Sequence, residues 1–174
     1  MSILIYAESA EGKIKKVAFE LASYAKKVAA SMGTTVTAVT INNSDNSALA
    51  AYGVDKVLNV SNDKLNNFSA KAYADVIAQA AKKEGTQIVL VSSTTDSLYL
   101  APLVAVALEA GYASNVVALP ESTSPFQVKR TAFSNKAFNI TEISTPVKVL
   151  GIAKNSFGLV ENAAAMTEES FAPS

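Results

Sequence analysis

Strand-like and helix-like segments alternate through the first 111 residues, and this alternation constrains the fold more than any other feature. Short runs of apolar or β-branched residues occupy residues 3–7, 34–41, 55–60 and 87–91. Each run is followed by a segment with helical spacing or by a short helix, at 17–32, 47–52, 70–81 and 98–110. A repeated strand–helix order requires parallel strands joined by right-handed crossovers. We therefore predict an α/β fold, a three-layer α/β/α Rossmann-like open parallel sheet.

The pattern changes after Gly111, where four strand-like runs are separated only by short turns. The runs lie at residues 113–119, 126–133, 137–143 and 147–153. Because no crossover helix fits between them, we expect C-terminal antiparallel strands or an edge hairpin that extends the parallel sheet. The last residues show little periodicity. We therefore divide the chain into a domain at 1–155 and, at 156–174, a tail or the start of a linker.

Composition excludes several classes of function. The chain has no cysteine and no histidine, which removes Cys/His zinc sites, cysteine nucleophiles and Ser-His-Asp triads. We identify no catalytic residue and no metal ligand set, and expect no enzyme. Lys+Arg and Asp+Glu are equal at 15 each, so no excess of positive charge favours nucleic acid or an anionic membrane. Without a basic leader or a long apolar run, we expect a cytoplasmic protein.

The polar loop between the fourth strand and the next helix is the best candidate for a ligand site. Hydroxyls and free N–H groups at a helix N-terminus can hold a phosphate or a carboxylate, which makes candidates of Thr94, Thr95, Asp96 and Ser97. The alternative is that Asp96 or Ser97 only caps the helix, with Pro102 in its first turn. No glycine-rich phosphate loop occurs. Glu8 and Glu11 could lie near the same sheet edge, where exposed loop acids are usually solvated.

Two apolar features suggest contact with a partner. The helix at 98–110 carries only one charge, Glu109, and a sheet can cover only one side of an all-apolar helix. We therefore expect its other side to meet a second element or a partner chain. By contrast, the first helix has charged residues off its apolar stripe, which predict a solvated face: Lys15, Lys16, Glu20, Lys26 and Lys27. A turn flanked by aromatic residues, at 133–138, predicts a hairpin.

Taken in order, several segments resemble the N-terminal domain of the electron transfer flavoprotein alpha subunit. The matching segments are residues 3–8 with 12–15, 51–57, 94–95 with Leu100, Ala101 and Pro102, and 133–137 with Pro146 and Phe157. Around Leu100 this chain departs from the family, which usually carries charged residues there. It has Ser97, Leu98, Tyr99 and Leu103 instead.

The resemblance implies a fold close to that of adenine nucleotide alpha hydrolases, and a scaffold domain that is non-catalytic alone. It implies pairing with an electron transfer flavoprotein beta subunit and service to acyl-CoA or other dehydrogenases through that complex. It also implies FAD, bound mainly by a second domain that is absent here. We place the partner interface at Leu98, Tyr99, Phe133, Asn135, Lys136 and Phe138. The alternative is a stand-alone AMP/ATP-binding module of universal-stress type that uses the loop at 94–97. A hydrolase or transferase is disfavoured by the lack of His and Cys.

Overall fold

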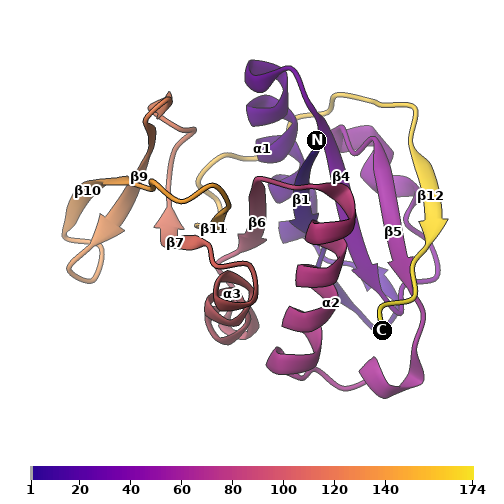
Figure 1. Cartoon of the computed structure of the whole chain (residues 1–174). Coiled ribbons are helices and arrows are strands. Elements are labelled where there is room, and N and C mark those ends of the chain that lie inside the picture. The colour runs from indigo at the N-terminus through magenta and orange to yellow at the C-terminus, as the bar shows by residue number, and fades with distance from the viewer. Residues whose placement is uncertain (1) are drawn as a thin grey trace.

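The computed structural model describes residues 2–174 and contains one large, mostly parallel sheet with helices on both faces (Figure 1). Its central strands run parallel in the spatial order β11, β6, β1, β4 and β5. Their bounds are β1 (Ser2–Tyr6), β4 (Thr35–Ile41), β5 (Lys56–Val60), β6 (Ile88–Ser92) and β11 (Lys148–Ile152). The strands β1 and β6 are buried along their whole length. The predicted α/β fold with an open parallel sheet is confirmed.

Helices cover the two faces of the sheet because successive strand side chains point to opposite sides. Ile3 and Ile5 of β1 pack in one core cluster with α1 (Lys16–Met32). Leu4 packs in a second cluster with α2 (Ala70–Glu84) and α3 (Thr95–Ala107). The short helices η1 (Ser47–Tyr52) and η2 (Asp63–Leu65) lie in the connections before and after β5. Gly33 and Gly85 end α1 and α2 in the left-handed conformation, as their positions predict.

The helix α3 differs from its prediction at both ends. Its N-cap is Thr94, whose hydroxyl accepts the Ser97 N–H, so capping by Asp96 or Ser97 is wrong. Pro102 lies in the helix interior rather than in the first turn, and it lacks the N–H that the Leu98 carbonyl would accept. Gly111 does not end the helix but begins the next strand. The polar loop is therefore one turn shorter than the sequence pattern indicates.

The four strands that follow α3 lie at one edge of the sheet, and the last three of them form an antiparallel extension. They are β7 (Gly111–Val116), β8 (Ser122–Thr123), β9 (Phe126–Ala132) and β10 (Ala137–Glu142). The hairpin of β9 and β10, here named the ribbon, is antiparallel as predicted and extends away from the helices in Figure 1. The antiparallel prediction for the last strand is wrong, because β11 lies between β6 and β7 and runs parallel to both. The ribbon itself serves as the long connection that parallel neighbours need.

The end of the chain, which we expected to be an irregular tail, contains a strand. The C-terminal segment (residues 153–174) passes from β11 beside α1 to the opposite edge of the sheet, in yellow in Figure 1. There β12 (Thr167–Ser170) pairs parallel with β5. A small hairpin of β2 (Ser9–Ala10) and β3 (Lys13–Ile14) follows β1. No helix within residues 2–174 combines the length and apolar character that a membrane span requires.

Candidate functional site

The carboxyl ends of β1 and β6 bring a buried acid against the start of α3. Glu8, directly after β1, is only 2% exposed. Its Oε1 accepts hydrogen bonds from the hydroxyls of Thr94, at 2.6 Å, and Ser97, at 2.9 Å. Its Oε2 lies 3.3 Å from the ammonium of Lys15. Both oxygens of this carboxylate are therefore paired with groups of the chain itself.

This arrangement gives the hydroxyl-rich loop a partner within the chain. The N-terminus of a helix attracts a negative charge, and at α3 the Glu8 carboxylate supplies one. Thr94 and Ser97 point their hydroxyls at it, whereas Thr95 is exposed and Asp96 is half-buried. Ligand binding by these four residues stays a prediction. The expectation that Glu8 is a solvated loop acid is wrong, because tertiary contacts with α3 and Lys15 bury it.

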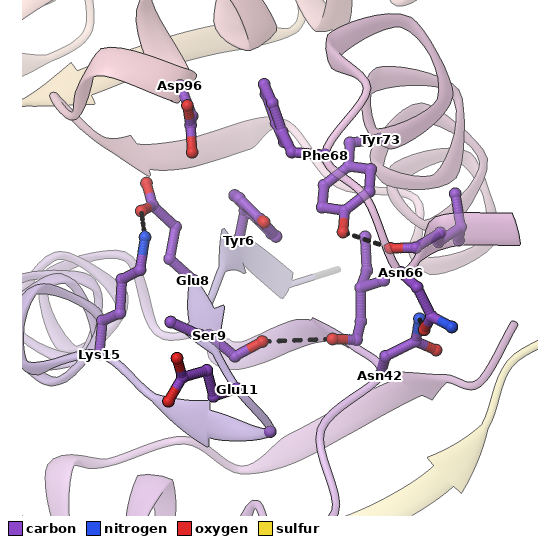
Figure 2. A pocket seen from close by; sticks show the side chains of 14 residues that line it. Tyr6, Glu8, Ser9, Glu11, Lys15, Asn42, Asn66, Phe68, Tyr73 and Asp96 are labelled. Atoms are coloured by element: carbon purple, nitrogen blue, oxygen red, sulfur yellow. Dashed lines mark hydrogen bonds and ion pairs between the residues drawn. The ribbon is translucent and has the colours of Figure 1, made fainter. Parts of the chain in front are cut away.

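A cavity of about 350 Å³ opens beside Glu8, at the carboxyl ends of β1 and β4 (Figure 2). It is lined by the end of β1, the small β2–β3 hairpin, the residue after β4, the connection before α2, and the first turn of α3. The side chains labelled in Figure 2 are Tyr6, Glu8, Ser9, Glu11, Lys15, Asn42, Asn66, Phe68, Tyr73 and Asp96. Its position at the carboxyl edge of a parallel sheet is where ligands of such folds bind.

Aromatic rings form one side of this cavity. Tyr73 meets Tyr6 edge-on with ring centroids 6.1 Å apart, and it meets Phe68 in the same way at 5.1 Å. The Tyr73 hydroxyl donates to the Leu65 carbonyl at 2.7 Å, which fixes its ring. Figure 2 shows Glu8 and Asp96 on the other side of the Tyr6 ring. One wall of the cavity is therefore aromatic and apolar, and the opposite wall is acidic.

Negative charge dominates the lining of the cavity. Glu8, Glu11 and Asp96 contribute three carboxylates, and Lys15 contributes the one ammonium. Burial, then the charge of Glu8, the neighbouring Tyr73 and the charge of Asp96 raise the pKa of Tyr6, so its phenol stays protonated at neutral pH. Within residues 2–174 the acidic side chains do not form a group suited to a metal ion. A phosphate would meet net repulsion here.

The predicted interface residues of α3 lie on its outer side. Leu98 and Tyr99 are exposed, Tyr99 to 68%, and Leu103 and Val106 continue the same apolar surface. We call these four residues the α3 face. The opposite side of the helix is buried against the sheet by Leu100, Ala101, Val104 and Ala105. Among the described residues, no other element covers the α3 face.

The predicted interface residues of the ribbon surround its tip. Phe133 is 82% exposed, and Phe138 is also exposed with the Lys129 ammonium 4.5 Å from its ring centroid. Asn135 takes a left-handed backbone conformation that the tight turn requires, and Lys136 is exposed. Asn135 and Phe138 line a shallow cavity of about 600 Å³ with Ser93, the residue before the α3 N-cap. The ribbon therefore lies beside the carboxyl edge from which α3 begins.

Comparison with known proteins matches nearly the whole chain to one family. The family model described as the electron transfer flavoprotein domain matches residues 3–172. The electron transfer flavoprotein subunit alpha of Thermoanaerobacterium thermosaccharolyticum is 34% identical over 120 residues, which cover 67% of this chain and 36% of that protein. The subunit alpha of Bacillus subtilis is 24% identical over 156 residues, 88% of this chain and 48% of that protein.

A third relative belongs to a complex with a named activity. The lactate dehydrogenase (NAD(+),ferredoxin) subunit LctC of Acetobacterium woodii is 31% identical over 151 residues, which cover 83% of this chain and 36% of that protein. The chain thus spans between 36% and 48% of the length of these curated relatives. The similarity concerns that part of each relative.

Proposed function

Because the chain belongs to the electron transfer flavoprotein family, we propose that it is the scaffold and subunit-interface domain of an alpha subunit. In this role it pairs with a beta subunit and supports FAD-mediated electron transfer from dehydrogenases, acyl-CoA dehydrogenases among them. It catalyses no reaction alone. FAD is held mainly by a second domain of the subunit, and this chain binds none by itself. Its cytoplasmic location stays a prediction.

The observation that carries this proposal is the exposed apolar surface on α3 and the ribbon. Large aromatic side chains are costly to leave in water and are enriched at the centres of protein interfaces. Tyr99 and Phe133 are among the most exposed large apolar residues of the chain. They belong to the two elements on which the interface was predicted. A beta subunit that covers both would bury them together.

The test is association with the beta subunit of the host organism's electron transfer flavoprotein. Isolated protein should be colourless, and calorimetry should detect a complex with the beta subunit. Tyr99→Lys and Phe133→Lys should each weaken that complex at least about tenfold, because each removes a buried aromatic anchor. Val160→Lys is the matched control, since Val160 is exposed to 51% but lies on the C-terminal segment. Full binding by both aromatic variants would contradict the interface. A yellow isolated protein with stoichiometric FAD would contradict the proposal that a second domain holds the FAD.

The competing function is a nucleotide-binding module that uses Thr94, Thr95, Asp96 and Ser97. The Glu8 carboxylate weighs against it, because it already occupies the hydroxyls of Thr94 and Ser97. Calorimetry with AMP and ATP separates the two functions. Saturable nucleotide binding that is lost in Thr94→Val would favour the module over the scaffold.

A further inference from the structure

The cavity in Figure 2 is bordered by the side chain of Tyr6, whose hydroxyl has no partner within residues 2–174. Tyr6 is only 5% exposed, and within residues 2–174 its hydroxyl makes no hydrogen bond. The ring is held by Tyr73, so the hydroxyl is fixed at the floor of the cavity. A hydroxyl that borders a cavity and has no partner in the chain is a position where a ligand can replace water as the hydrogen-bond partner.

Two carboxylates at the same cavity also lack a cation. Lys15 forms its ion pair with Glu8. Within the described residues, the carboxylates of Asp96 and Glu11 form neither an ion pair nor a hydrogen bond. Asp96 is half-buried on the first turn of α3, and Glu11 is exposed on the β2–β3 turn. Their charges lie at the rim of a cavity whose floor is apolar and aromatic. Such a site favours a positive ligand over a negative one.

We propose that this cavity binds a small organic cation, an amine or guanidine with a short apolar portion. The cationic end lies against Asp96, whose charge acts on Tyr6, and donates a hydrogen bond to the Tyr6 hydroxyl oxygen. The apolar portion lies against the rings of Phe68 and Tyr73, which form the apolar wall of the cavity. The cavity volume of about 350 Å³ is in the range of small-ligand sites. None of the residues that line this cavity is among the residues proposed for the beta-subunit interface.

The other ligand classes fit less well. A metal ion needs several converging oxygen ligands, and no suitable acidic group exists within residues 2–174. A nucleotide brings phosphates into a lining with three carboxylates and one ammonium.

The test is a titration of isotope-labelled protein followed by nuclear magnetic resonance. The probes are butylguanidine and its neutral counterpart butylurea, which match in size and shape but differ in charge. Butylguanidine should give saturable shifts of the amides near Glu11, Asn42 and Phe68, with weaker binding at high salt. Butylurea should give none. Equal shifts with both probes, or none with butylguanidine, would overturn the proposal, as would saturable binding of AMP at these residues.

Three variants assign the binding to the proposed contacts. Asp96→Asn and Phe68→Ala should each weaken butylguanidine binding about tenfold, which corresponds to about 1.4 kcal/mol. Tyr6→Phe should weaken it without lowering the melting temperature, because the hydroxyl has no partner to lose. Glu161→Gln, at an exposed carboxylate on the C-terminal segment, is the control and should bind as the original chain does. Unchanged affinity in both Asp96→Asn and Tyr6→Phe would refute the site.

Discussion

Glu20 lies on the side of α1 that the sequence pattern marks as charged, yet its side chain is buried. Its carboxylate accepts three backbone N–H groups of the C-terminal segment: Asn155 at 2.9 Å, Phe157 at 3.0 Å and Gly158 at 3.0 Å. Burial opposes ionisation, but these hydrogen bonds outweigh it and lower the pKa of Glu20 below its ordinary value. One residue of α1 thus fixes the start of the C-terminal segment.

Glu20→Gln should lower the free energy of unfolding at pH 7 by about 2 kcal/mol, because hydrogen bonds to a charged group are lost. Since the folded pKa lies below the unfolded value, the stabilisation is present above about pH 4.5 and disappears as the pH falls through the folded pKa. Urea unfolding from pH 7 to pH 3 would therefore show the difference between original and variant shrinking. Glu161→Gln is the control. If the difference in the free energy of unfolding did not depend on pH, the charge of the Glu20 carboxylate would not be what stabilises the fold.

The residues of the candidate site could be located from sequence only in part. The loop at 94–97 was found because strand, polar turn and helix follow one another, and the structure places it at the carboxyl edge. The partner of this loop, Glu8, is 86 positions from Thr94 in the chain. No local pattern reports such a distance, so an acid that is buried by tertiary contacts is indistinguishable from a solvated one. The same holds for Lys26, which pairs with Asp55.

At the scale of elements, the strand β12 closes the sheet edge that β5 would otherwise expose. Thr167 N–H donates to the Asp55 carbonyl at 3.0 Å, and Phe171 N–H donates to the Asn59 carbonyl at 2.9 Å. The carboxylate of Glu169 is held by Lys83 and by Lys56, hydrogen bonds that lower its pKa to about 2. Four residues that include two acids and no apolar side chain carry too little pattern for a strand prediction, so only the pairing itself reveals this element.

Thr167→Pro should release β12 from β5, because proline has no N–H to donate to the Asp55 carbonyl. Ser170→Pro is the matched change. Side chains and N–H groups alternate along a strand, so Ser170 directs its N–H away from β5. We expect Thr167→Pro to lower the free energy of unfolding by about 1 kcal/mol and to speed amide exchange in β5, and Ser170→Pro to do neither. Equal effects would mean that the ladder hydrogen bond is not what holds the strand.

At the scale of the molecule, the alternating half of the fold follows from the sequence and the rest does not. The strands β1, β4, β5 and β6 and the helices α1, η1 and α2 were predicted within a few residues, because burial on both faces of a parallel sheet imposes long apolar runs and amphipathic helices. The small β2–β3 hairpin and η2 were not predicted. The place of β11 between β6 and β7 could not be predicted. The hairpin of the ribbon was predicted, but no local pattern indicates where the chain rejoins the sheet after it.

The difference in burial between the central strands and the ribbon predicts unequal stability across the molecule. The strands β1 and β6 are fully buried at the centre of the sheet, whereas β10 pairs only with β9 and is largely exposed. Local opening needs less free energy where few apolar contacts are lost. Hydrogen exchange of the isolated chain should therefore show ribbon amides exchanging about a hundredfold faster than those of β1 and β6.

Adding the beta subunit extends the same measurement to the proposed function. Exchange should slow in the ribbon and at the start of α3, because those surfaces leave solvent, and it should stay unchanged in β12 at the opposite edge. A ribbon as protected as β1 before the addition would contradict the stability argument. Slowing confined to β12 would place the partner on the wrong edge of the sheet. The exposed aromatic residues would then need a different explanation, and the two results can be told apart in one experiment.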